Sequence, residues 1–347
     1  MSENGKKKIK ALGYFHSADF LSYSSIILFI IILSLVLGIV TPNHSFMTQS
    51  NILNVIRQVA VYGMLAVGMA FVMIHGGIDL SVGSTAGLCG AVSCLLVVND
   101  IAGVIPSMVV SILLGALIGL FNGLVIAYTG IPPFVATLGT QITVRGFAYI
   151  VCNGKPIGNL PESLKGLGVN RFLGIPIPIL FMLAMFIIGG IILDKTALGR
   201  SFYAVGGNQT AARLAGVDIN KVKVLAYTLC GIMAGLAGLI LACRNASAQP
   251  TAGNTFETEA IAGNAMGGVA FTGGSGTIAG VFFGIFLMGI INNGMNLLGI
   301  NSYWQYVVKG LIIIASVVYS MNSNKFKNRK RKKTKNQVSG NQAVPIQ

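Results

Sequence analysis

The chain has 347 residues, of which 54% are hydrophobic and 10% are charged, and its mean hydropathy is +0.76. A water-soluble globular domain has roughly a quarter of its residues charged, so this composition excludes one and indicates an integral membrane protein. The net charge of +15 does not indicate nucleic-acid binding, because much of it lies at the two ends of the chain.

The chain begins with a basic segment, residues 1–20, and finishes with a basic tail, residues 322–347. Lysine and arginine beside apolar helices stay on the cytoplasmic side, so both termini are expected there, which requires an even number of membrane crossings. The tail is expected to be solvated and attracted to anionic membrane lipid, and no nucleic acid partner is expected.

Between these ends, apolar runs long enough to cross about 30 Å of hydrocarbon follow one another through residues 21–321. They predict an all-α, polytopic transmembrane domain of about ten helices. Beyond residue 257 the pattern is glycine-rich and interrupted, which predicts broken or re-entrant helices. The runs cover residues 24–41, 55–75, 80–98, 103–128, 134–152, 174–193, 222–243, 259–271, 277–298 and 303–321.

Two pairs of similar segments suggest that the domain has two halves. Residues 76–84 resemble residues 267–275, and Asn122-Gly123 resembles Asn293-Gly294. Five crossings between corresponding helices would give the halves opposite orientations, as in inverted-repeat transporters. Chance similarity between glycine-rich segments is the alternative. Separate glycine rows, Gly115 to Gly123 and Gly231 to Gly238, are expected to be helix-packing seams.

The first of these segments is a candidate structural motif with an acidic residue inside it. Its expected structural residues are Gly76, Gly77, Asp79, Ser81 and Gly83. The Asp79 carboxylate is expected to cap the helix that begins at Leu80 or Ser81. Contact with a substrate is the alternative for Asp79.

The longest hydrophilic interior stretch, residues 194–223, contains five basic and two acidic residues and is therefore placed in the cytoplasm. Within it, Asn208 is a plausible N-cap and Gly216 a natural stop, which predicts a surface helix of two or three turns. Such a helix could dock into a partner and transmit its movement, or it could be an ordinary interfacial helix. The expected coupling residues are Gly206, Gly207, Asn208, Ala211, Ala212, Arg213 and Gly216.

Polar residues within the apolar runs allow two interpretations. Their amides and hydroxyls could line a path for a hydroxylated solute, or they could join helices by hydrogen bonds. The charged candidates are Arg57, Asp79, Arg145, Arg244 and Lys309; most lie near predicted helix ends, where snorkelling to the interface is expected. No string of buried acids is evident, which argues against proton or sodium coupling. The candidate path residues are Asn122, Thr137, Gln141, Asn292, Asn293 and Asn296.

No catalytic, cofactor or metal site is expected in this chain. His16, His44 and His75 lack metal-ligand spacing, and the sequence contains no G-x-x-x-x-G-K-S/T phosphate-binding loop. The five cysteines show no paired spacing and are expected to be small core residues. Any energy for transport must therefore come from another chain.

Several segments in consistent order from about residue 20 to 321 carry a resemblance to a known family. They are residues 76–84, 133–140, 199–217, 292–299 and 303–310. Together they resemble the permeases of bacterial ABC importers for ribose, galactose and similar monosaccharides. The resemblance implies a multi-pass protein of the bacterial inner membrane that pairs with a second permease copy. It also implies a cytoplasmic ATP-binding subunit, which binds the ATP, and an extracytoplasmic sugar-binding protein.

Some positions depart from that family's pattern. Asn264-Ala265-Met266 replaces a small aliphatic run, Ser275 stands where a basic residue is frequent, and His75 where a small residue is expected. These departures leave the expected fold unchanged but weaken any inference about which sugar is carried. A transporter or facilitator that works alone remains the alternative function.

Overall fold

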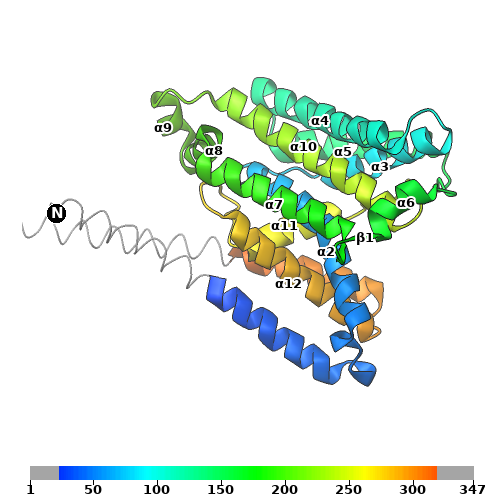
Figure 1. The fold of residues 1–347 in the computed structure, drawn as a ribbon. Helices are drawn as coiled ribbons and strands as arrows, with labels where there is room; N and C mark the ends of the chain where they lie inside the picture. The colour runs from blue at the N-terminus through cyan, green and yellow to red at the C-terminus, as the bar shows by residue number, and fades with distance from the viewer. Residues whose placement is uncertain (1–22, 319–347) are drawn as a thin grey trace, which may run out of the picture.

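The computed structural model describes residues 23–318, and the basic segments 1–20 and 322–347 lie outside the described residues. Helices dominate this part of the chain, and the single pair of two-residue strands in it forms a short hairpin (Figure 1). Flanking the labelled elements are the helices Tyr23–Val40 and Ser302–Val318. The labelled elements are η1 (Pro42–Met47), α2 (Gln49–Ile74), α3 (Val82–Val98), α4 (Val104–Thr129), α5 (Pro133–Val151), α6 (Glu162–Val169), β1 (Arg171–Phe172), β2 (Ile175–Pro176), α7 (Ile177–Lys195), α8 (Ala197–Gly207), α9 (Gln209–Leu214), α10 (Ile219–Arg244), α11 (Phe256–Met266) and α12 (Ile278–Leu297).

Within the described residues, seven helices are long and apolar enough to cross a membrane: Tyr23–Val40, α2, α4, α5, α7, α10 and α12. Two further apolar helices, α3 and Ser302–Val318, are shorter. The expectation of an all-α polytopic membrane protein is therefore confirmed. The expected run 259–271 is wrong at its end, because α11 stops at Met266 before Gly267-Gly268, and Gly268 has φ +85°.

The centre of the bundle is built from α2, α10 and α12, whose apolar windows are mostly buried, whereas little of Tyr23–Val40 is buried. A helix that is apolar all round belongs either in a core or against lipid. The exposed apolar side chains of Tyr23–Val40, among them Ile39 and Leu28, are therefore suited to contact with lipid.

Small residues bring the central helices together. A Cβ added at Gly231 of α10 would overlap the carbonyl oxygen of Gly115 on α4, and one added at Gly119 would overlap the carbonyl oxygen of Tyr227. The expected glycine seam is thus confirmed, and it fixes α4 antiparallel to α10. All five cysteines are free and buried, as expected for core residues.

Two non-helical breaks interrupt the bundle, at residues 75–81 after α2 and at residues 267–277 between α11 and α12. At about 1.5 Å per residue, the 11-residue α11 covers roughly half of the hydrocarbon thickness. We call the two ends of the bundle the α8 end and the α6 end, since Figure 1 places α8 and α9 at the opposite end of the long helices from α6 and the β1–β2 hairpin.

Candidate functional site

The hydrophilic stretch forms two helices at the α8 end, each started by a capping side chain. Thr196 accepts a hydrogen bond from the amide of Gly199 to begin α8, and Asn208 accepts one from the amide of Ala211 to begin α9. Asp218 caps α10 in the same way through the amide of Lys221. These caps satisfy backbone donors that would otherwise lack partners.

The N-cap expected at Asn208 is confirmed, as is the stop at Gly216, which has φ +82°. The helix that follows Asn208 has six residues, slightly less than the two turns expected, and the sequence interpretation missed α8. Within α9, Ala212 is buried against the rest of the chain, whereas the Leu214 side chain is 86% exposed. The outward apolar group of this segment is therefore Leu214.

The last turn of α8 packs directly on both breaks in the bundle. The amide of Gly274 donates a 2.8 Å hydrogen bond to the carbonyl oxygen of Ile74, at the end of α2. Gly206 lies against this pair so closely that an added Cβ would overlap the carbonyl oxygen of Ile74 and lie 2.5 Å from the nitrogen of Gly274. The hydroxyl of Tyr203, one turn earlier, donates to the carbonyl oxygen of Gly276 at 2.8 Å. The last turns of α8 are therefore in direct contact with the 267–277 loop and the end of α2.

The similar segments 76–84 and 267–275 meet at this junction. A Cβ added at Gly273 would lie 2.9 Å from the backbone nitrogen of Gly76, and both glycines have positive φ. The helices that follow the two segments, α3 and α12, both run from the α8 end toward the α6 end. Asn122 and Asn293, by contrast, lie on α4 and α12, which run in opposite directions.

Inside the 76–84 segment, Asp79 is fully enclosed and its carboxylate accepts hydrogen bonds from the amide and hydroxyl of Ser81. The Ser81 hydroxyl accepts from the side-chain amide of Asn122, whose oxygen accepts from the hydroxyl of Thr140. The chain of contacts joins the start of α3 to α4 and α5. The expected cap is wrong in position, because α3 begins at Val82 with Ser81 as its N-cap residue, and Asp79 bonds to Ser81 in the turn before the helix.

The remaining residues of this motif and its neighbourhood also make local contacts. Gly83 lies against the backbone of Gly253 and the carboxylate of Glu257, where a Cβ would not fit. Thr137 of α5 donates its hydroxyl to the carbonyl oxygen of Pro133 and, at 3.4 Å, to that of Ile78. Gly77 lies against the hydroxyl of Tyr227.

A set of polar and charged side chains lies between α5 and α11. Gln141 donates to the buried carboxylate of Glu257 at 3.3 Å, and Arg145 donates to the carbonyl oxygens of Pro250 and Ala252. Arg145 therefore binds the backbone of the segment that precedes α11. Snorkelling was expected for such cations, and for Arg145 it is wrong because the guanidinium has partners within the bundle.

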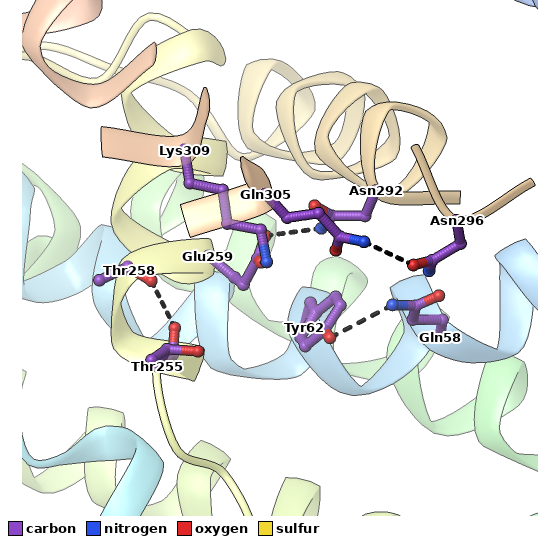
Figure 2. Close-up of polar contacts among 9 residues, drawn as sticks. All are labelled: Gln58, Tyr62, Thr255, Thr258, Glu259, Asn292, Asn296, Gln305 and Lys309. Atoms are coloured by element: carbon purple, nitrogen blue, oxygen red, sulfur yellow. Dashed lines mark hydrogen bonds and ion pairs between the residues drawn. The ribbon is translucent and has the colours of Figure 1, made fainter. Parts of the chain in front are cut away.

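A second polar group lies nearer the α6 end and is shown in Figure 2. The carboxylate of Glu259 on α11 is buried, forms an ion pair with Lys309 of the terminal helix, and accepts a 3.0 Å hydrogen bond from the side-chain amide of Asn292. Around this centre, Gln305 donates to Asn296 at 2.8 Å, and Gln58 donates to the hydroxyl of Tyr62 at 3.3 Å. We call this group the Glu259 cluster; its members are Gln58, Tyr62, Glu259, Asn292, Asn296, Gln305 and Lys309.

The structure divides the six expected path residues among separate contacts. Asn122 and Thr137 lie near Asp79, Gln141 meets Glu257, and Asn292 and Asn296 belong to the Glu259 cluster. Asn293 forms a reciprocal pair with Asn51, in which each amide nitrogen donates to the oxygen of the other. That pair is helix-joining, because each side chain satisfies the other.

Sequence reasoning missed Glu257, Glu259 and the partner of Lys309. The set of charged candidates is therefore incomplete, since Glu257 and Glu259 are buried as well as Asp79. Two glutamates spaced two residues apart within an interrupted apolar stretch were the available signal. An intramembrane acid of this kind is retained only where a partner or a function compensates its desolvation.

Apolar helices of membrane-spanning length, with two non-helical breaks packed against the last turns of α8 at one end, define a polytopic membrane protein. The chain belongs to the family described as branched-chain amino acid transport system, permease component, which matches residues 51–317.

Individual relatives agree over most of their length. The chain is 38% identical to the ribose import permease protein RbsC of Escherichia coli K12, over 88% of this chain and 95% of that protein. It is 42% identical to RbsC of Bacillus subtilis 168, over 83% and 89%, and 39% identical to the L-arabinose transport system permease protein AraH of Escherichia coli K12, over 88% and 92%. No solved structure matches. The expected resemblance to permeases of sugar import systems is confirmed.

Proposed function

We propose that this chain is the transmembrane permease subunit of an ABC importer that carries a monosaccharide such as ribose, galactose or xylose across the bacterial inner membrane. ATP is bound by separate cytoplasmic subunits, and this chain itself holds no cofactor. An extracytoplasmic binding protein delivers the sugar, and two copies of the permease form the pore. The relatives named for ribose and L-arabinose import support the sugar class.

The observation that carries the mechanism is the contact between α8 and the two breaks. An ATPase subunit that docks on the α8–α9 segment holds the exposed Leu214 and moves α8 as it closes. Because Gly206 abuts both Ile74 and Gly274, that movement passes by backbone contact into α2 and the loop before α12. Packed backbone transmits displacement well, since close-packed interiors yield little to compression.

We further propose ten membrane helices with both termini in the cytoplasm, which makes the α8 end cytoplasmic. The nine apolar helices and the half-length α11 supply that number. An inverted repeat is supported by the opposite directions of α4 and α12, which carry Asn122 and Asn293. It is not supported by segments 76–84 and 267–275, because α3 and α12 run the same way.

The alternating-access path is proposed to pass the polar groups at Gln141 and Glu257 and at the Glu259 cluster. Their amides and carboxylates suit the hydroxyls of a sugar. A transporter that works alone is the alternative, and the buried acids remove one argument against it. The distribution of those acids still disfavours a proton relay, since Glu257 and Glu259 each have an amide partner and Asp79 is bonded to Ser81.

Reconstitution separates the two functions. The purified chain is placed in liposomes with or without the ATPase subunit and the binding protein encoded in the same genome, and uptake of radiolabelled D-ribose and L-arabinose is measured. We expect uptake only when both partners and ATP are present. Rapid uptake by this chain alone, without ATP, would falsify the proposal.

A further inference from the structure

We propose that the Glu259 cluster is a transit subsite that binds a neutral, multiply hydroxylated ligand, a monosaccharide, on the extracytoplasmic side of the permease. The assignment of side and cargo rests on the proposed function. The subsite itself rests on the geometry of seven side chains contributed by α2, α11, α12 and the terminal helix (Figure 2).

The first argument is an unused acceptor. Asn292 is only 2% exposed. Its amide nitrogen donates a hydrogen bond to Glu259, but its side-chain oxygen has no hydrogen-bond partner among the described residues. A buried acceptor without a donor costs about 1–3 kcal/mol, which a ligand hydroxyl would recover. The neighbouring Asn293 shows the contrast, because its amide is used on both sides by Asn51.

The second argument is charge. Glu259 and Lys309 cancel each other, so the cluster attracts neither a cation nor an anion by net charge. What remains is a set of donors and acceptors in several directions: an ammonium, a carboxylate, amides and a phenol. A neutral polyol requires this combination, since each hydroxyl both donates and accepts.

The third argument is access. Asn296 is exposed, Gln58, Gln305 and Lys309 are half-buried, and Tyr62, Asn292 and Glu259 are buried. Polar side chains therefore continue from the surface at the α6 end to a charged pair inside the bundle. A pair that only joins two helices, such as Asn51 and Asn293, does not require side chains of decreasing exposure that lead in from the surface.

A tryptophan beside the cluster provides a fluorescence signal for ligand binding at this site. The chain's one tryptophan, Trp304, is 64% exposed and immediately precedes Gln305. The full-length protein in lipid nanodiscs is titrated with D-ribose, L-arabinose and L-leucine, with Trp304 fluorescence and saturation-transfer NMR of the ligand as two independent readouts. We expect a saturable response in at least one readout to one or both sugars and none to L-leucine.

Variants locate the response. Asn292→Leu should raise the half-saturating sugar concentration tenfold or more, and Gln305→Ala, at a half-buried position that tolerates truncation, should raise it at least threefold. The control is Thr258→Val, next to Glu259 on α11, whose hydroxyl donates to the carbonyl oxygen of Thr255 in its own helix turn; it should leave the half-saturating concentration unchanged. Monodisperse elution checks folding.

Several results would overturn the assignment: no sugar response in either readout, an equal response in Gln305→Ala and wild type, or saturable binding of L-leucine. The reconstituted uptake assay keeps the two hypotheses apart. ATP-driven sugar uptake without a response at this cluster removes the subsite and leaves the proposed function standing. A sugar response at the cluster without ATP-driven uptake leaves the subsite standing and removes the proposed function.

Discussion

Adding one methyl group at Gly206 tests whether α8 transmits movement through backbone contact. Gly206→Ala would drive its Cβ into the hydrogen bond between Gly274 and Ile74. The adjacent residue supplies the control, because a Cβ at Gly207 meets nothing within 4 Å. Both residues lie in the last turn of α8, so the intrinsic helix preference of alanine affects the two variants similarly.

The size of the effect follows from two losses. Disrupting one backbone hydrogen bond costs about 0.5–1.5 kcal/mol. Forcing extra volume into a packed contact costs about 1–3 kcal/mol, and neither backbone atom beside Gly206 can rotate away. Gly206→Ala should therefore destabilise the junction by about 1.5–4.5 kcal/mol, whereas Gly207→Ala should stay within about 0.5 kcal/mol of wild type.

Uptake and ATPase rates of the reconstituted importer provide the assay, with the thermal midpoint of each variant as a check on folding. We expect Gly206→Ala to lose uptake tenfold or more and to weaken the dependence of ATPase activity on sugar-loaded binding protein. Equal uptake and equal midpoints for the Gly206 and Gly207 variants would refute the idea that this contact carries force.

Further predictions concern the seam, the docking face and the buried ion pair. Gly231→Ala should lower the thermal midpoint, because overpacking costs about 1–3 kcal/mol of stability. Gly190→Ala should leave the midpoint unchanged, because a Cβ there meets nothing within 4 Å. Labelling of the buried cysteines by a thiol-reactive dye during heating measures both midpoints. Leu214→Asp should abolish ATPase stimulation at an unchanged midpoint, because the side chain is 86% exposed, and a lowered midpoint would contradict this. Glu259→Gln should lower the free energy of unfolding by up to about 3–5 kcal/mol, because Lys309 loses its counter-charge. Adding Lys309→Met should recover part of that stability in the same melting assay. No recovery would argue that the two charges do not interact.

The sequence alone determined the class of protein and most of its local structure. Composition excludes a soluble fold, apolar runs locate the helices to within several residues, and rows of small residues mark packing faces on α4 and α10. The start of α9 at Asn208 was also predictable. These features depend on single residues or on neighbours within a few turns, which the linear order of the chain displays directly.

Which distant polar groups meet depends on the tertiary packing. Glu259 and Lys309 are 50 positions apart, and Asn51 and Asn293 are 242 apart. Which face of each helix turns inward depends on the packing of all its neighbours, so spacing could not show that Ala212 is buried while Leu214 is exposed. The meeting of α8 with two glycine-rich breaks has the same origin, because backbone contact between segments remote in sequence depends on how whole helices pack.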